Sequence, residues 1–506
     1  MQPVTRRTFL GSLPLWPLVA AQARPDRWRP SSLDPFSLGV ASGEPASGGF
    51  VIWTRLAPDP LNGGGMPPVA VSVGWEVARD DRLQSVVRRG RVVAHPERAH
   101  AVHVEIDGLQ PDRWYFYRFR VGDTVSPVGR ARTLPMAGAI VSRLRFAFAS
   151  CQHFEQGYFT AYRHMADEDL AVVFHLGDYI YESAPDDGRA RRHRGPELFT
   201  LQDYRNRYAQ YKLDPNLQAA HAACPWIVTW DDHEVADNYA GAISENDDPA
   251  PAFLARRAAA YQAYYEHMPL RRASRPRGAD ARMYRGFAFG GLTSCCVLDT
   301  RQYRTDQPCG DNTTWPCAAM NDPRATMLGA DQERWLLDRF RTSRARWNVV
   351  PQQVMMANVN RRQNGRDRYS MDSWAGYEVE RRRLLDLFAA HRDRNPVVLT
   401  GDLHSSWVND LRVHADGPTV ATEFVGTSIS SGGDGQDFPR HMEAVLADNP
   451  FVRFYNEQRG YVSCDVDQDT LRAAYRVVDY VSEPGASCRT RATFVVESGR
   501  PGAHRV

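Results

Sequence analysis

Four short apolar runs in the second part of the chain each lead, within a few positions, to a polar or metal-ligating residue. They cover residues 144–151, 170–174, 226–229 and 397–399. Short apolar runs bounded by turn residues predict buried strands. From about residue 143 onward, such runs alternate with helical patterns, of which 331–343 and 377–392 are the clearest. This alternation predicts a layered α/β domain over residues 143–490.

The first part of the chain, residues 34–136, has a different pattern, in which apolar residues occupy every second position. The alternation is regular from Val69 to Val77 and from Val102 to Ile106. A Leu-x-Pro turn at 109–111 then precedes the aromatic stretch 114–119. This order is similar to the end of a fibronectin-like β-sandwich, so we expect a small β-sandwich domain before the α/β domain.

The first 23 residues have the features of a twin-arginine signal peptide. Arg6 and Arg7 precede an apolar stretch at 13–21, and Ala21-Gln22-Ala23 is a typical cleavage site. The apolar stretch is far shorter than the roughly 20 residues that span a bilayer. We therefore expect export by the twin-arginine machinery, a periplasmic or secreted protein and no stable membrane anchor. The alternative is a disordered basic N-terminus.

Net charge and cysteine content bear on the class of protein and on its disulfide bonds. A chain of 506 residues predicts more than one domain, and a formal net charge of +2 argues against a dedicated nucleic-acid binder. An oxidising destination permits disulfides. Cys309 and Cys317 flank a turn-rich loop that a disulfide would close. Cys464 and Cys488 are a second possible pair, which the sequence cannot fix.

Polar residues that follow the four predicted strands predict a metal site. Carboxylates at the carboxyl ends of strands meet at one edge of an open α/β sheet. Cys151, Asp178, Tyr181 and His404 together offer sulfur, oxygen and nitrogen ligands, which favour a transition metal. Iron is the best candidate from these residues, and Zn²⁺ or Mn²⁺ stays open.

Two further strand-end residues, Asp232 and Asp402, offer oxygen alone, which suits a hard cation such as Ca²⁺. Asp178 is placed to bridge the two metals. The sequence thus predicts a mixed iron and calcium site.

These motifs carry a resemblance to the PhoD-type alkaline phosphatases, within the wider metallophosphoesterases. The shared blocks lie at 36–43, 177–181, 230–234, 298–304, 372–377, 401–404 and 424–433. The resemblance spans nearly the whole chain in order. It implies an α/β fold class, in which a metallophosphoesterase-like layered α/β catalytic domain follows the fibronectin-like β-sandwich. It also implies one Fe³⁺ with two Ca²⁺ ions.

The resemblance also implies which residues bind each ion. Cys151, Asp178, Tyr181 and His404 are assigned to iron, and Asp178, Asp232 and Asp402 to the first calcium. Asn238 is the candidate for the second calcium, with an ordinary turn asparagine as the alternative. Purple acid phosphatases share the G-D-x-x-Y block, but have Asn where this chain has Asp232 and His where it has Asp402.

Other polar residues near the motifs have expected roles. Arg301 is predicted to clamp phosphate through its planar fork, or else to pair with Asp299. His233 is expected to donate a proton to the leaving group or to bond to phosphate. Asp231 is expected to orient its neighbours, and His153 to lie in an exposed loop.

The function predicted from these residues is hydrolysis of small or polymeric phosphate esters outside the cytoplasm, by attack of a metal-bound hydroxide. One alternative is phosphodiesterase or phospholipase D-like activity at the same metals, with nucleic acid only as a possible substrate. The other alternative is a cell-surface polymer-binding protein with a structural metal site. The calcium ligands argue against it, because they are fewer than the six to eight oxygens that Ca²⁺ takes.

Overall fold

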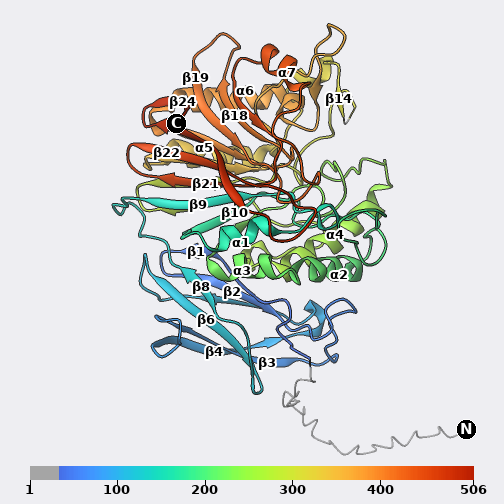
Figure 1. Ribbon diagram of the computed structural model, residues 1–506, viewed down its shortest axis with the longest axis vertical. Helices are drawn as coiled ribbons and strands as arrows, with labels where there is room; N and C mark the ends of the chain where they lie inside the picture. Colours follow the sequence, from blue (N-terminus) through green and yellow to red (C-terminus); the bar gives the residue numbers. More distant parts are fainter. Residues whose placement is uncertain (1–32, 311) are drawn as a thin grey trace, which may run out of the picture.

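The computed structural model describes residues 33–310 and 312–506. Two large sheets pack face to face and carry helices on their outer sides, and a smaller sheet lies at the N-terminal end (Figure 1). The predicted signal peptide, residues 1–23, lies outside the described residues. Among the residues that are described, no helix has the length and apolar character needed to cross a membrane.

The first large sheet has ten strands in the order β24-β23-β22-β21-β9-β10-β11-β1-β2-β5. At its centre β9, β10 and β11 are parallel, as expected for the predicted strands that end in ligand residues. The bounds are β1 Val40–Ala46, β2 Gly49–Arg55, β5 Ala101–Ile106, β9 Leu144–Ala149, β10 Val172–His175, β11 Trp226–Val228, β21 Gly460–Val466, β22 Thr470–Val478, β23 Cys488–Glu497 and β24 Arg500–Arg505.

The second large sheet has seven strands in the order β12-β13-β15-β17-β19-β18-β20. Its strands β13, β15, β17 and β19 are parallel to one another. The bounds are β12 Arg285–Phe289, β13 Thr293–Val297, β15 Trp347–Gln352, β17 Pro396–Thr400, β18 Ser406–Arg412, β19 Thr419–Val425 and β20 Val452–Asn456. A separate small ribbon pairs β14 Thr313–Thr314 with β16 Tyr369–Ser370.

Helices cover the outer faces of both large sheets. The first group packs under β9 to β11 and lies between them and the N-terminal sandwich in Figure 1; it comprises α1 Thr160–Ala166, α2 Leu201–Lys212, α3 Pro215–Ala223 and α4 Ala250–His267. The second group packs on β15 and β17 and comprises α5 Gly329–Thr342 and α6 Glu378–Ala390. A short helix, α7 Met442–Asp448, precedes β20, and the 3₁₀ turns are η1 Pro96–Arg98, η2 Phe154–Gln156, η3 Arg272–Ser274, η4 Ala318–Asn321, η5 Trp374–Tyr377 and η6 Arg392–Arg394.

Alternation along the central strands explains the layers. In β9, Phe146 and Phe148 point into the core between the two sheets, whereas Ala147 faces the helices. In β17, Val397 and Leu399 enter the same inter-sheet core, and Val398 faces the second group of helices. Both faces of each central strand are therefore buried, which accounts for the continuous apolar runs in the sequence.

The N-terminal part is the β-sandwich that the sequence predicted. A sheet in the order β4-β3-β6-β7, with β8 paired to β6, packs its apolar side against β2 and β5. The bounds are β3 Val71–Ala78, β4 Val86–Ala94, β6 Trp114–Val121, β7 Thr124–Val125 and β8 Gly129–Arg132. The other sandwich sheet is not separate, because β1 pairs in parallel with β11 through Gly43 and Trp226.

The two parts therefore share one sheet, although the expected boundary at 136–143 does fall between β8 and β9. The α/β sheet also continues past residue 490, since β23 and β24 reach Arg505. Of the two cysteine pairs considered, the disulfide between Cys309 and Cys317 is confirmed. The second pair, Cys464 and Cys488, which the sequence left open, is not formed: both are free thiols, on β21 and β23, which β22 separates.

Candidate metal centre

The predicted ligands gather where the carboxyl ends of strands from both large sheets meet. Cys151 follows β9, Asp178 follows β10, and Asp402 and His404 follow β17. The two sheets touch here through a bridge between Ser150 and Ser428. Five of the seven expected ligands have left-handed backbone: Cys151 (φ 59°), Asp178 (φ 56°), Asn238 (φ 50°), Asp402 (φ 67°) and His404 (φ 52°). Such conformations cost roughly 1–3 kcal/mol each and concentrate at functional sites.

Three expected iron ligands form one compact group. Ligand atoms of Cys151, Asp178 and His404 all lie within 4.8 Å of one another. Tyr181 completes the group, with its hydroxyl 2.8 Å from Asp178 Oδ2 and 3.0 Å from His404 Nε2. The structure thus brings together the four residues that the sequence assigned to a transition metal.

Two further groups continue from the first and contain the carboxylates expected for calcium. Asp178, Asp232 and His233 form one, and Asp231, Asp232 and Asp402 form the other, each within the same 4.8 Å limit. Asp178 is shared between the first two groups, and Asp232 between the last two. The three groups therefore form one continuous centre, in which Asp178 occupies the bridging position.

Unpartnered oxygens show that this centre fits metal ions. Asp178 Oδ1 and Asp231 Oδ2 are buried, and neither has a hydrogen-bond partner. Asp232 Oδ1 also accepts no hydrogen bond, although Arg301 Nη2 lies 3.4 Å from it. Burying an ionised carboxylate oxygen without a partner is costly unless a cation is bound. One side of the centre is open, since the side chains of Asp402 and His404 are 24% and 35% exposed. The donor atoms and the opening together suit metals that also contact substrate.

The pKa values of the candidate ligands also indicate a site for cations. Burial, together with the neighbouring carboxylate of Asp232, raises the pKa of Asp178 well above its usual 3.8. Burial and the charge of Asp231 likewise raise the pKa of Asp402. Burial is the main cause of the raised pKa of the Cys151 thiol and of the Tyr181 phenol, and the charge of Asp178 adds to it. Bound cations reverse such shifts, because they stabilise the ionised ligands.

The guanidinium of Arg301 donates to carboxylates of the centre and its surroundings. It is fully buried, and its Nη1 and Nη2 donate to the two oxygens of Asp372 at 2.7 and 2.9 Å. Its Nε donates to Asp231. The planar fork is therefore already filled by a carboxylate, which does not fit the clamp interpretation. The alternative pairing with Asp299 is also absent at the guanidinium, since Asp299 accepts from the backbone N–H of Arg301.

His233 lies at the open side of the centre, with its side chain 20% exposed. Its Nδ1 is 2.8 Å from Glu182 Oε2, and its ring centroid is 4.2 Å from that of Tyr181. Burial opposes protonation, but Glu182 and Asp232 outweigh it and raise the pKa of His233 well above 6.5. Glu182 thus engages Nδ1, while the other ring nitrogen, Nε2, lies 3.8 Å from Asp237 Oδ1, on an exposed side chain.

Asn238 and His153 are both held by local contacts. The backbone N–H of Asn238 donates to Asp232 at 2.7 Å, and its side-chain amide donates to Glu245 at 3.3 Å. The prediction of an exposed His153 is wrong: the residue is buried, and its Nδ1 accepts the Glu155 N–H at 3.2 Å, which caps η2. Its ring packs 4.3 Å from the Tyr181 ring, measured between centroids.

Several supporting residues were not singled out from the sequence. Glu234 accepts the backbone N–H groups of Asp178, Tyr179 and Asp231, so it holds two strand ends together. Ser431 donates to the Tyr181 oxygen at 2.8 Å. Both residues lie inside motif blocks, 230–234 and 424–433, and Glu182 directly follows Tyr181. Their positions inside or next to these blocks could have indicated that they support the metal centre.

Known proteins resemble this chain over nearly its whole length. The family model described as PhoD-like phosphatase matches residues 146–475, and its N-terminal domain model matches residues 20–135. Alkaline phosphatase D of Bacillus subtilis (strain 168) is 52% identical over 480 residues, covering 93% of this chain and 82% of that protein. A solved structure described as PhoD superposes with a TM-score of 0.93 at 51% identity, covering 95% of this chain and 93% of the other. The chain belongs to the PhoD-like phosphatase family.

Proposed function

We propose that this phosphatase, a hydrolase of phosphate esters, works with one Fe³⁺ and calcium at the centre described above. Cys151, Asp178, Tyr181 and His404 would hold the iron, and Asp178, Asp232 and Asp402 the first calcium. Asn238 remains the candidate for a second calcium. When bound, the metals supply Lewis-acid chemistry, which offsets phosphoryl charge and activates water. The observation that carries the proposal is the sharing of Asp178 and Asp232 among three adjoining ligand groups.

His233 acts on the substrate in this proposal. Its Nδ1 is engaged by Glu182, so Nε2 is the atom that faces a phosphate ester at the open side. From there it either bonds to a phosphoryl oxygen or donates a proton to the leaving alkoxide. Glu182 positions the ring for this role and stabilises its charged form.

Arg301 acts through carboxylates rather than on phosphate. It binds Asp231 and Asp372 directly, and its Nη2 lies 3.4 Å from Asp232 and 3.8 Å from Asp402. One buried guanidinium therefore offsets part of the negative charge of the calcium ligands and fixes their orientation. In this role it holds the metal centre in shape.

Residues 1–23 support a further proposal, that the protein is exported through the twin-arginine machinery and acts in the periplasm or outside the cell. Folding before export would allow the centre to form first. Blocking export with an Arg6→Lys, Arg7→Lys variant should leave active protein in the cytoplasm. Active protein outside the cell in that variant would contradict the proposal.

Metal analysis of native protein, combined with turnover of a matched monoester and diester, tests the main proposal. We expect iron and calcium, loss of activity on chelation, and better recovery with Ca²⁺ than with Zn²⁺ while iron stays bound. Preference for the diester would favour phosphodiesterase activity at the same centre. A fully active protein with zinc and no iron would exclude the assigned metals.

Asp402→Asn provides a sharper test, because it removes one charge and keeps the shape of the side chain. We expect a higher Ca²⁺ concentration for half-maximal activity, by roughly tenfold or more, as one charge-assisted ligand is lost. Asp416→Asn, at an exposed position between β18 and β19, is the matched control. Normal activity of Asp402→Asn at low calcium would remove Asp402 from the ligand set.

A further inference from the structure

His153 lies beside the metal centre and has no task in the function proposed above. The residue is buried, and its ring packs between the rings of Tyr181 and His193, at centroid distances of 4.3 and 5.2 Å. Its backbone is fixed as well, because the N–H donates to Ser431 at 3.1 Å and the carbonyl accepts from Ser430 at 2.9 Å. The position and the plane of this imidazole are therefore set by the protein itself.

The hydrogen bond at one ring nitrogen of His153 determines what the other nitrogen can do. Nδ1 accepts the backbone N–H of Glu155 at 3.2 Å, so Nδ1 carries no proton. An imidazole that accepts at Nδ1 is neutral and carries its proton on Nε2. Nε2 donates to no other described residue, and it keeps contact with solvent. It is therefore a neutral donor that is available to a ligand.

Two other histidines show where this donor lies. After burial, the charges of His233 and His404 do most to lower the pKa of His153, which places both rings close to it. Their side chains, 20% and 35% exposed, border the open side of the centre. His233 and His153 pack on the two faces of the Tyr181 phenol, because two rings at centroid distances of 4.2 and 4.3 Å could not share one face. Nε2 of His153 thus borders the same opening, across Tyr181 from His233.

A separate metal ion is the other use that this group of side chains suggests. Ligand atoms of His153, Glu155 and His193 lie within 4.8 Å of one another. Their lone pairs are already engaged, however. Glu155 accepts the backbone N–H groups of Asp186 and His193 at 3.2 and 2.8 Å. Nδ1 of His193 accepts from the guanidinium of Arg207 at 3.0 Å, which also places a positive charge where a cation would bind. The group therefore serves to hold His153 in place.

We propose that Nε2 of His153 donates a hydrogen bond to a non-bridging phosphoryl oxygen of the bound ester. This role of His153 rests on the function proposed above, because the ester must bind at the open side of the metal centre. A charged oxygen gains more from a fixed donor than a neutral oxygen does, and a neutral donor can be partly buried without a counter-charge. His153 thus holds the phosphoryl group on one side of Tyr181, and His233 lies on the other.

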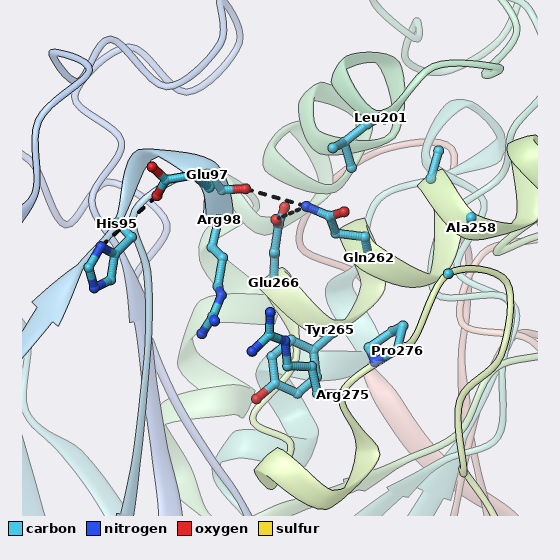
Figure 2. A pocket seen from close by; sticks show the side chains of 12 residues that line it. His95, Glu97, Arg98, Leu201, Ala258, Gln262, Tyr265, Glu266, Arg275 and Pro276 are labelled. Atoms are coloured by element: carbon cyan, nitrogen blue, oxygen red, sulfur yellow. Dashed lines mark hydrogen bonds and ion pairs between the residues drawn. The ribbon is translucent and has the colours of Figure 1, made fainter.

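Two substitutions separate this contact from the packing role of the ring. His153→Asn keeps an acceptor at the level of Nδ1 and lacks the Nε2 donor; asparagine is also a preferred N-cap residue, so η2 should stay capped. His153→Gln carries an amide N–H about as far out as Nε2, but it is a poorer cap. His95→Asn is the matched control, since His95 is exposed and lines a separate cleft between the N-terminal sandwich and α4 (Figure 2).

Calorimetry of the holoenzyme measures the binding of inorganic phosphate, alongside kcat and KM for a phosphate monoester. His153→Asn should weaken phosphate binding about tenfold or more and raise KM, because a hydrogen bond to a charged oxygen is lost. Its iron content and Tm should stay as in wild type. His153→Gln should recover part of the lost affinity, and His95→Asn should behave as wild type.

Unchanged phosphate binding in His153→Asn would overturn the proposed contact. Equal losses in the Asn and Gln variants would overturn it as well, since the loss would then come from the ring and not from the donor. Loss of iron together with phosphate affinity would mean that His153 acts only through Tyr181. A lower kcat with intact phosphate binding would place the donor on the leaving group instead. A wild-type enzyme that is active without iron and calcium would contradict the proposed metals, whereas the phosphate measurements would still decide the role of His153.

Discussion

At the residue scale, Tyr181 is the most constrained of the expected ligands. Its oxygen lies 2.8 Å from Asp178, 3.0 Å from His404 and 2.8 Å from Ser431. Burial raises the pKa of its phenol, so only a strong cation would hold it as phenolate. A hard trivalent ion does this better than Zn²⁺ or Ca²⁺, which makes Tyr181 the residue that reports the identity of the metal.

Tyr181→Phe tests that role spectroscopically. Phenolate bound to ferric iron gives a visible charge-transfer band, so the native enzyme should be coloured and the variant should lose or shift the band. We expect a lower iron content as well, measured by elemental analysis. Tyr480→Phe, at an exposed position on the surface, is the control. An identical visible spectrum in Tyr181→Phe would exclude phenolate ligation.

Arg301 leads to a prediction about stability rather than substrate binding. Arg301→Lys keeps the charge but cannot hold Asp372 with two parallel bonds. We expect a loss of about 3 kcal/mol in the free energy of unfolding, since the buried carboxylate of Asp231 loses the hydrogen bond from Nε. Asp372 would keep its bonds from Arg304 and Gln307. Asp372→Asn should cause a similar loss, and the double variant should lose less than the sum. Denaturant titration measures all three.

The opposite outcome would restore the clamp interpretation. If Arg301→Lys reduced kcat/KM with unchanged stability, and Asp372→Asn had no effect on either, then Arg301 would act on phosphate directly.

The contrast between Tyr181 and Arg301 shows which parts of the site can be predicted from the sequence. The ligands that follow strands were predictable, because the carboxyl ends of neighbouring parallel strands meet wherever the sheet forms. The partners of Arg301 were not, since Asp231 and Asp372 lie 70 and 71 residues away and neither shares a strand with it. His153 was misjudged for the same reason: its ring is buried against the rings of Tyr181 and His193, which lie 28 and 40 positions further along the chain.

At the scale of elements, α2 carries an unusual buried charge. Lys212 is the sole lysine of the chain, and its ammonium lies 4.4 Å from the Trp53 ring centroid and 3.5 Å from His221 Nε2. No acid among the described residues pairs with it. Burial lowers the pKa of Lys212 from 10.5 to about 7. The helix thus places an amine at the contact between α2 and β2.

This shift makes stability depend on pH in a defined window. Between pH 7 and 10.5 the unfolded chain binds more protons at Lys212 than the folded chain does, so stability rises with pH there. The destabilisation caused by burying the charged Lys212 is fully present below the pKa of the folded state. It disappears as the pH rises through the pKa of the unfolded state, 10.5. For a shift from 10.5 to about 7, this destabilisation is on the order of 5 kcal/mol.

Lys212→Met isolates this contribution. The variant should be more stable than wild type near pH 7, and the difference should shrink toward pH 10 when unfolding is followed by denaturant titration at each pH. Arg344→Met serves as the control at an exposed site. A difference that stays constant with pH would mean that Lys212 remains charged in the folded protein.

Element boundaries were predictable to within a few residues where periodicity was strong. The patterns at 331–343 and 377–392 correspond to α5 Gly329–Thr342 and α6 Glu378–Ala390. In β3 the alternation begins at Val71 rather than Val69. What no local pattern showed is the pairing of β1 with β11, because their residues lie almost 200 positions apart and meet only through tertiary packing.

At the scale of the whole molecule, that pairing joins the two predicted domains into one structural unit. Glu44 of β1 accepts two hydrogen bonds from Arg285 of β12, at 2.7 and 2.6 Å. The Trp53 indole N–H donates to the carbonyl of Glu266 in α4 at 3.0 Å. Removing the N-terminal part would leave β11 as an unpaired edge. The two parts of the chain, each of which matches its own family model, therefore need not fold independently of one another.

A cut between the two parts tests this continuity. Residues 136–138 are exposed and lie outside any strand, so a specific protease site inserted there should be cleaved without unfolding the protein. Because backbone pairing and buried contacts cross the junction, the two fragments should co-elute in size-exclusion chromatography and keep phosphatase activity. Calorimetry of the intact chain should show one cooperative transition, since neither part keeps its core alone. Fragments that separate under native conditions, with the larger one still active, would instead show two independent domains that merely touch.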